Sequence, residues 1–183
     1  NLPYHQARLE RTRLRELGLS SHPRLEEVIQ VPEGLERGWL KCRVHYGEKI
    51  ERIEYEPHIR RRINSLKLVY SDKIDYTFKK ADRSELQKLY AERGSCDDIL
   101  IVKEDCLSDS FYANTAFWDG TGWFTPDTPL LKGTMRAFLL DQNLLREARI
   151  RIEDLVKYSK VRLINAMNDL QEGAEITMDR VIF

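Results

Sequence analysis

The sequence predicts an α+β fold in two small domains, because hairpin strands and separate helices are interspersed along a chain of 183 residues. That length is sufficient for one full hydrophobic core or two small ones. A polar, basic segment with three consecutive arginines interrupts the pattern between Pro57 and Arg62. Such a run can bind phosphate, but a solvated linker is the simpler explanation. We therefore expect a small N-terminal α+β domain over residues 1–60 and a larger C-terminal α+β domain over residues 61–183.

The first domain is expected to hold two helices and a hairpin. These elements lie over residues 3–17, 23–30, 39–46 and 50–56. Pro3 suits the first turn of a helix, the leucines that follow recur at helical spacing, and Gly18 ends the pattern. Apolar and polar residues then alternate before the turn at Gly47, as they do in a hairpin. The chain opens at Asn1 directly into a helix start and has no initiator Met, so we expect upstream residues to be missing.

The second domain is expected to mix strands and helices. One strand begins at Ile63 or Ser65, and further elements follow in order: a helix over 81–92, strands over 98–103 and 114–118, helices over 133–141 and 152–158, and a strand over 160–166. Residues 98–103 are apolar enough for a buried strand, and an Asp-Gly-Thr-Gly turn closes the strand that follows.

Composition excludes several classes of protein. The 30 Lys and Arg residues balance the 30 Asp and Glu residues, so no global field draws the chain onto nucleic acid or an anionic membrane. No apolar run is long enough to span a bilayer, and the N-terminus lacks the order of a signal peptide. Three cysteines, none in a CxxC pair, fit neither a disulfide scaffold nor a four-ligand zinc site. We expect reduced thiols, no bound metal and a cytoplasmic protein without a nucleic-acid or membrane partner.

Six short motifs follow one another in an informative order. They are His-Gln-Ala-Arg-Leu at 5–9, Phe-Lys-Lys-Ala-Asp-Arg at 78–83, Asp-Ser-Phe-Tyr-Ala-Asn at 109–114, Thr-Pro at 125–126, Leu-Lys-Gly-Thr-Met-Arg at 131–136 and Leu-Ile-Asn-Ala-Met at 163–167. Over nearly the whole chain, this order resembles the class IV (fold type IV) pyridoxal-phosphate enzymes, which include branched-chain and D-amino acid aminotransferases and aminodeoxychorismate lyase. The resemblance implies a two-domain, D-amino acid aminotransferase-like fold, pyridoxal 5'-phosphate (PLP) as the cofactor, and a homodimer with sites near its interface.

The resemblance assigns the cofactor phosphate first to an arginine and to a turn. A phosphate monoester carries nearly two negative charges and needs several donors in a closed pocket. The local sequence alone favours Arg8 as one of many arginines on an exposed helix, but the family's His-x-x-Arg-Leu motif reverses that preference and makes Arg8 the bidentate candidate. Asn165 and Ala166 fall where family members place another phosphate-binding turn.

The third phosphate-binding segment is a helix start. The backbone N–H groups of Thr134 and Met135, after Gly133, would point at the phosphate along the positive end of the helix dipole. The family usually reads Gly-Ile-Thr-Arg here, so Met135 replaces the usual threonine and only its backbone contribution carries over. Thr134 is a candidate to supply a hydroxyl from the neighbouring position. Without the resemblance, Gly-Thr is simply a helix start.

The catalytic lysine is expected at one of two adjacent positions, Lys79 or Lys80. It must lose its charge to attack the cofactor aldehyde, and its amine then serves as the proton shuttle. In lyase relatives the lysine is followed three and four residues later by Asn-Arg, and Lys79 has Asp82 and Arg83 at those offsets. We therefore assign the role to Lys79. Because adjacent residues on a strand or strand end face opposite sides, we expect Lys80 to face solvent.

A carboxylate beside the pyridine nitrogen keeps it protonated, so that the ring accepts electrons. The family uses Glu in a Glu-x-x-x-x-Asn pattern, and here Asp109 stands five residues before Asn114. The shorter acid keeps the charge but needs closer approach by about one methylene. On local grounds, a turn aspartate is an equally good explanation of Asp109.

Two further assignments concern the substrate and the aromatic residues. Arg43, in the middle of a strand, is the candidate for binding a substrate carboxylate, and a surface arginine is the competing explanation. The aromatic residues of the second domain are expected in the core rather than around the cofactor. They are Tyr112, Phe117, Trp118 and Trp123.

The motif details favour a lyase over an aminotransferase. The Lys-x-x-Asp-Arg and Asn-Ala-Met motifs are similar to the lyases' Lys-x-x-Asn-Arg and Asn-Ala-Leu, and Ser84 stands where many aminotransferases have a tyrosine. The resemblance therefore implies a PLP-dependent lyase of the folate pathway, which eliminates pyruvate from 4-amino-4-deoxychorismate to give p-aminobenzoate. The alternatives are a class IV aminotransferase acting on branched-chain or D-amino acids and, from another class, a catalytically silent PLP-binding protein.

Overall fold

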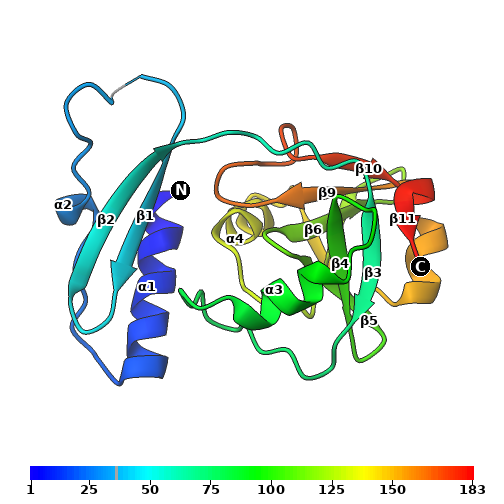
Figure 1. Ribbon diagram of the computed structural model, residues 1–183, viewed down its shortest axis with the longest axis horizontal. Helices are drawn as coiled ribbons and strands as arrows, with labels where there is room; N and C mark the ends of the chain where they lie inside the picture. The colour runs from blue at the N-terminus through cyan, green and yellow to red at the C-terminus, as the bar shows by residue number, and fades with distance from the viewer. Residues whose placement is uncertain (36) are drawn as a thin grey trace. The chain divides into compact units, whose positions relative to one another are not determined.

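The computed structural model describes residues 1–35 and 37–183, which form two compact units, residues 1–60 and residues 61–183. Figure 1 shows the helices and strands of both units. The first unit contains α1 (Leu2–Leu17), α2 (Leu25–Val28), β1 (Leu40–Tyr46) and β2 (Ile50–Pro57). These elements confirm the predicted order of two helices and a hairpin.

A buried arginine joins α1 to two loops of the first unit. Arg13 is 4% exposed, and its guanidinium donates hydrogen bonds to the backbone carbonyls of Ser21, Gly47 and Glu48. A buried guanidinium satisfied by carbonyl groups avoids the cost of an unpaired charge. Gly18 ends the helix in the left-handed region, with a φ of 67°.

α2 is shorter than the helix predicted over residues 23–30. Its flanking residues Arg24 and Ile29 both have extended backbone, which limits the helix to Leu25–Val28. The side chain of Gln6, on α1, accepts a hydrogen bond of 2.9 Å from the backbone N–H of Leu25 and so fixes where α2 begins.

The second unit contains two sheets and two longer helices. Its elements are β3 (Leu66–Tyr70), α3 (Ser84–Ala91), β4 (Asp98–Lys103), β5 (Cys106–Ser110), β6 (Asn114–Trp118), β7 (Trp123–Pro126), α4 (Thr134–Asp141), β8 (Arg146–Ala148), the 3₁₀ helix η1 (Ile152–Lys157), β9 (Lys160–Ile164), β10 (Glu175–Thr177), the 3₁₀ helix η2 (Met178–Arg180) and β11 (Val181–Ile182). One sheet has the strand order β10-β9-β6-β7-β8, and the other has the order β11-β3-β4-β5.

Alternation along the strands builds three apolar layers in this unit. On β4, Leu100 and Val102 face the cluster shared by the two sheets, whereas Ile99 and Ile101 face a second cluster that includes Leu86 of α3. A third cluster packs α4 against β6 and β9 of the five-stranded sheet. The two sheets therefore pack face to face, with α3 and α4 on their outer faces.

β5 is a strand that the sequence analysis does not predict. Its residues, Cys-Leu-Ser-Asp-Ser, are largely polar, yet all five are buried. The turn before β5 contains no glycine. Glu104 and Asp105 form it instead, with positive φ values of 51° and 60°. The segment predicted as a helix over 152–158 is the 3₁₀ helix η1. None of the helices in the described part of the chain has the length and apolar character needed to cross a bilayer.

Candidate active site

Asp109 is a buried carboxylate on β5, which excludes the explanation of a turn residue. Its Oδ1 accepts a hydrogen bond of 2.7 Å from Nδ2 of Asn114, and its Oδ2 accepts one of 2.9 Å from the backbone N–H of Leu131. Burial raises the pKa of Asp109 to about 6, against the opposing effect of these donors and of Arg136. A cation beside Asp109 would therefore stabilise its charged form.

Asn114, the first residue of β6, joins this carboxylate to the segment before α4. Besides Asp109, its Nδ2 donates a hydrogen bond of 2.8 Å to the carbonyl of Leu131. Gly133, the residue before α4, has a φ of −69° and a ψ of 151°, which any residue adopts, so its backbone does not require glycine. A Cβ atom at position 133 would lie 2.0 Å from Oδ1 of Asn114. Glycine is needed here for space.

The first turn of α4 turns its side chains inward. Met135 is 8% exposed and packs with Leu139 and Ile164 in the cluster beneath α4, so its side chain cannot replace the hydroxyl of a threonine. Thr134 is buried as well. The buried guanidinium of Arg136 donates a hydrogen bond of 2.9 Å to the carbonyl of Pro126 and forms an ion pair of 2.6 Å with Glu147.

Asn165 and Ala166 directly follow β9, beside the start of β6. Asn114 is paired with Ile164 in the antiparallel register of β6 and β9, which brings this turn next to Asn114. The Oδ1 of Asn165 accepts a hydrogen bond of 2.9 Å from the backbone N–H of Met167, so the asparagine shapes its own turn. The structure therefore brings Asp109, Gly133 and Asn165 together around Asn114.

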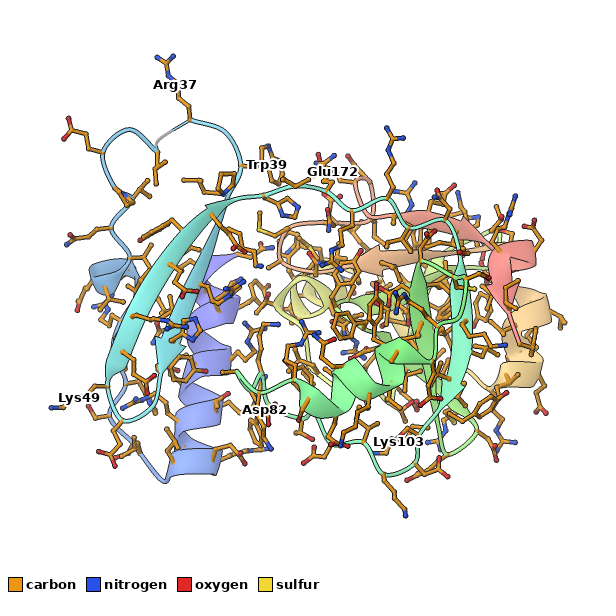
Figure 2. The ribbon with its side chains drawn as sticks, viewed as in Figure 1. Arg37, Trp39, Lys49, Asp82, Lys103 and Glu172 are labelled. Atoms are coloured by element: carbon orange, nitrogen blue, oxygen red, sulfur yellow. The ribbon has the colours of Figure 1, made fainter. Side chains whose placement is uncertain are left out.

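Lys79 and Lys80 lie in the loop between β3 and α3, and both are exposed. The expectation that they occupy a strand or strand end is wrong, so alternation does not separate them. Asp82, labelled in Figure 2, lies just before α3 and accepts a hydrogen bond of 2.9 Å from the N–H of Ser84, the first residue of the helix. The next residue, Arg83, donates a hydrogen bond to the carbonyl of Phe111. This contact ties the loop of Lys79 to the segment between Asp109 and Asn114.

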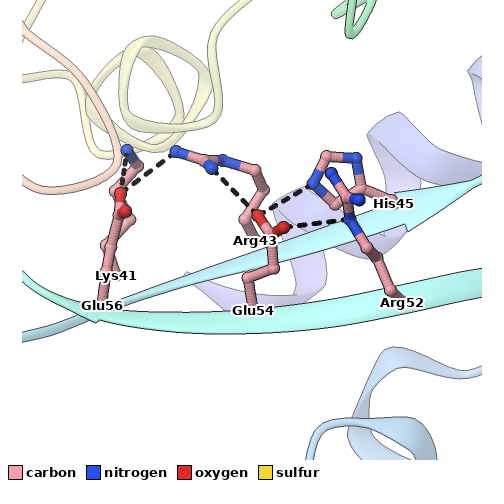
Figure 3. A network of polar contacts seen from close by, with 6 residues as sticks. All are labelled: Lys41, Arg43, His45, Arg52, Glu54 and Glu56. Atoms are coloured by element: carbon pink, nitrogen blue, oxygen red, sulfur yellow. Dashed lines mark hydrogen bonds and ion pairs between the residues drawn. The ribbon is translucent and has the colours of Figure 1, made fainter.

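Arg43 belongs to the first unit and is engaged in an ion-pair network on the hairpin. Its guanidinium lies 3.0 Å from Glu54 and 3.1 Å from Glu56, both on β2. Figure 3 shows how Lys41, His45 and Arg52 complete the network around the two glutamates. A substrate carboxylate would have to compete with these carboxylates for Arg43.

Arg8 also belongs to the first unit. It is half-buried in the middle of α1, beside the buried Leu9, and its carbonyl accepts a hydrogen bond of 2.9 Å from the hydroxyl of Thr12. Its role toward a phosphate stays a prediction. In residues 1–35 and 37–183, no group of three or more His, Cys, Asp or Glu side chains is placed to hold a metal ion.

Comparison with known proteins identifies the family. A family model described as amino-transferase class IV matches residues 54–176, about two thirds of the chain. The chain therefore belongs to the class IV aminotransferases, a family of PLP-dependent enzymes, and its cofactor is PLP. An uncharacterized protein of Haemophilus influenzae is 37% identical over 172 residues, which are 93% of this chain and 92% of that protein.

Solved structures agree with this family. A Haemophilus somnus protein provisionally named 4-amino-4-deoxychorismate lyase is 33% identical, with a TM-score of 0.85 over 92% of this chain and 90% of that one. A Mesorhizobium loti protein provisionally named an amino-acid aminotransferase is 21% identical, with a TM-score of 0.80 over 98% of this chain and 91% of that one. The latter similarity shows the fold alone.

The donor set of the second unit fits PLP by its chemistry. A protonated pyridine nitrogen is the kind of cation that would stabilise the buried carboxylate of Asp109. A helix start such as that of α4 directs backbone N–H groups toward an anion, as a phosphate requires. Lys79 supplies a primary amine from a loop that is tied to the Asp109 segment. Asp109 and the start of α4 lie beside Asn114, and the loop of Lys79 is joined to the same segment through the contact of Arg83 with Phe111.

Asn114, Arg83 and Arg136 are the residues of this neighbourhood that the sequence analysis leaves without a role. Asn114 and Arg83 appear there only as markers of motif spacing. The fixed offset of Asn114 from the acid was the available signal, because a side chain five residues from Asp109 returns to it only across the turn between two strands. Nothing in the local sequence of Arg136 distinguishes it from a surface arginine.

Proposed function

We propose that this protein is a PLP-dependent lyase that eliminates pyruvate from 4-amino-4-deoxychorismate and leaves p-aminobenzoate, a step of folate biosynthesis. The observation that carries the proposal is the segment after Lys79. Ser84, at the position of the aminotransferase tyrosine, is the first residue of α3 and is held there by Asp82. A small residue at a helix start supplies no phenol to the site. The name of the Haemophilus somnus protein supports the same activity.

Different residues are proposed to bind different parts of PLP. Lys79 would hold the cofactor through its aldehyde, and Asp109 would pair with its protonated pyridine nitrogen. The phosphate is proposed to be bound by Arg8 and by two backbone segments. These segments are Gly133, Thr134 and Met135 at the start of α4 and Asn165 with Ala166 after β9. Arg43 is proposed to bind a substrate carboxylate.

Lys79 acts as the base and then as the acid of the reaction. When bound, PLP supplies an electron sink for the charge that develops on the substrate carbon next to nitrogen. The free Nζ of Lys79 would remove the ring proton from that carbon. The bond between the ring and the enolpyruvyl oxygen breaks, and Lys79 returns the proton to the departing pyruvate. Aromatisation of the ring to p-aminobenzoate makes the step favourable.

Asp109 is fitted for its role by the donors around it. A carboxylate with a pKa near 6 is mostly charged at neutral pH, so it can hold the pyridine nitrogen in its protonated state. We further propose that the protein works in the cytoplasm as a homodimer, acts on a small amino substrate and binds neither nucleic acid nor membrane. Analytical ultracentrifugation tests the dimer.

Product analysis tests the proposed reaction. The PLP-loaded protein is incubated with 4-amino-4-deoxychorismate and without any keto acid, and p-aminobenzoate and pyruvate are measured. The proposal predicts both products in equal amounts from the wild-type protein and neither from Lys79→Ala. Turnover of amino acids that depends on an added keto acid, without these products, would instead make the protein an aminotransferase. PLP binding without either turnover would make it a silent binding protein.

A further inference from the structure

One buried side chain contacts both ends of the proposed PLP site. Asn114 is 5% exposed, and its Nδ2 donates to Oδ1 of Asp109 at 2.7 Å and to the carbonyl of Leu131 at 2.8 Å. The N–H of Leu131 in turn donates to the other oxygen of Asp109 at 2.9 Å. Asp109, Asn114 and Leu131 thus form a closed ring of hydrogen bonds. Such a ring fixes the segment before α4 relative to the carboxylate.

The remaining polar atom of Asn114 faces the start of α4. Its Oδ1 lies where a Cβ atom at position 133 would be, at 2.0 Å, and its Cγ lies 3.2 Å from the same point. Because real Cβ atoms do not approach an oxygen so closely, any other residue at position 133 would displace either the carboxamide of Asn114 or the helix start. The carboxamide of Asn114 cannot move without breaking the buried ring with Asp109, and the helix start lies two residues after Leu131, which belongs to the same ring.

The same ring affects the charge of Asp109. The hydrogen bonds from Asn114 and Leu131 lower the pKa of Asp109 against the larger effect of burial. Arg136, the charged group that faces it from α4, acts in the same direction. If the Nδ2 donor were removed, the balance would shift further toward the neutral acid, which does not pair with a pyridinium.

We propose that Asn114 is a positioning residue that sets the place and the charge of Asp109 relative to the start of α4, and that position 133 is glycine to make room for it. The proposal rests on the proposed roles of Asp109 and α4 in binding PLP. It assigns to Gly133 a second role besides the phosphate, because glycine there admits the side chain of Asn114.

A double-mutant cycle in the cofactor-free protein tests the steric part. Urea unfolding is measured for the wild type, Gly133→Ala, Asn114→Ala and the double variant. Gly133→Ala is expected to lower the urea midpoint of the wild type. The drop is expected to be at least about twice the drop that the same substitution causes in the Asn114→Ala background, where the obstructing oxygen is absent. Equal drops in the two backgrounds would overturn the proposal. If Asn114→Ala does not fold, Asn114→Ser takes its place in the cycle.

Titration of the Asp109 carboxyl tests the electrostatic part. Carbon-13 NMR of side-chain carboxyl groups in the cofactor-free protein gives the pKa of Asp109. Asn114→Ala is expected to raise this pKa above its value of about 6. Thr115→Val is the matched control, because Thr115 lies next to Asn114 on β6 and its hydroxyl donates a buried hydrogen bond of 2.7 Å to the carbonyl of Ser108, not to the carboxylate of Asp109. An equal pKa in Asn114→Ala and the control would contradict the proposal.

PLP affinity connects the two parts to the cofactor. PLP affinity is measured by the quenching of tryptophan fluorescence during titration with PLP. Asn114→Ala is expected to bind PLP at least roughly tenfold more weakly than the wild type, while Thr115→Val retains wild-type affinity. Wild-type affinity in Asn114→Ala would overturn the positioning role. If the wild type itself bound no PLP, the proposed function would fail, and the unfolding cycle and the carboxyl titration would still decide whether Asn114 positions Asp109.

Discussion

The guanidinium of Arg83 donates a hydrogen bond to the carbonyl of Phe111 and lies 4.3 Å from the centroid of its ring. Phe111 is itself held in place, because its ring stacks on Tyr90 with a centroid distance of 4.3 Å and its backbone N–H donates a hydrogen bond of 3.2 Å to Asp98. Arg83 follows Lys79 by four residues, and Phe111 follows Asp109 by two. This contact therefore links the loop that contains Lys79 to the end of β5, the strand that contains Asp109.

Arg83→Lys is expected to slow the reaction of Lys79 with PLP by about tenfold and to destabilise the protein by about 1 to 2 kcal/mol. Lysine keeps the charge but has neither the planar fork nor the stacking surface of arginine. The rate is measured from the growth of visible absorbance after mixing with PLP, and the stability from urea unfolding.

The matched control for Arg83 is Arg93→Lys. Arg93 lies 4.3 Å from the ring centroid of Tyr90 and donates a hydrogen bond of 3.1 Å to the carbonyl of Tyr90. It therefore makes the same kinds of contact in the same cluster without reaching the loop of Lys79. Equal rates of PLP reaction in the two variants would show that the contact of Arg83 with Phe111 has no special importance for Lys79.

The contribution of Asp98 to stability is expected to fall as the pH rises from about 4 to about 6. Burial raises the pKa of Asp98 from 3.8 to about 6, although Ile99, Phe111, Arg61 and Arg83 all lower it. The folded state therefore binds more protons than the unfolded state in this window, and each proton lost on raising the pH costs stability. Above the folded pKa, the contribution stays constant.

Asp98→Asn tests this pH dependence. The amide oxygen still accepts the hydrogen bonds from Ile99 and Phe111, but the group no longer titrates. The variant is therefore expected to lose the part of the pH-dependent change in unfolding free energy that Asp98 contributes, on the order of 2 to 3 kcal/mol. Urea unfolding at several pH values measures it, and an unaltered pH slope would show that Asp98 does not titrate as described.

Arg43→Ala is expected to raise KM for the substrate while leaving the fold intact. The ion pairs of Arg43 with Glu54 and Glu56 are exposed, and exposed pairs contribute little to stability. Arg52→Ala is the control, because Arg52 pairs with Glu54 in the same network. Steady-state kinetics gives KM for both variants. An equal KM in Arg43→Ala and Arg52→Ala would show that Arg43 does not bind the substrate.

The elements with strong periodicity could be predicted from sequence. α1 and β4 match their expected ranges within one residue, because a helical or fully apolar pattern extends over their whole length. β5 could not be predicted, because its polar side chains are buried through hydrogen bonds across strands. Ser108, for example, donates to the carbonyl of Thr128, far along the chain. Tertiary contacts of this kind leave no local pattern.

The candidate site shows the same division. The motif order indicates which segments belong together, and the structure joins the segments of Asp109, Gly133 and Asn165 around Asn114. Sequence alone could not show that Arg43 is held by two glutamates, because those partners lie on the neighbouring strand. The sequence analysis also placed Lys79 on a strand or strand end, whereas the residues around it form a loop that Arg83 joins to Phe111.

The most direct test of the account is to locate the lysine that bonds to PLP. The purified protein is incubated with PLP, reduced with borohydride and digested, and peptide mass spectrometry identifies the modified residue. A pyridoxyl group is expected on Lys79 and none in the Lys79→Ala variant. Modification of Lys80 instead, or of neither residue, would contradict the assignment of the site.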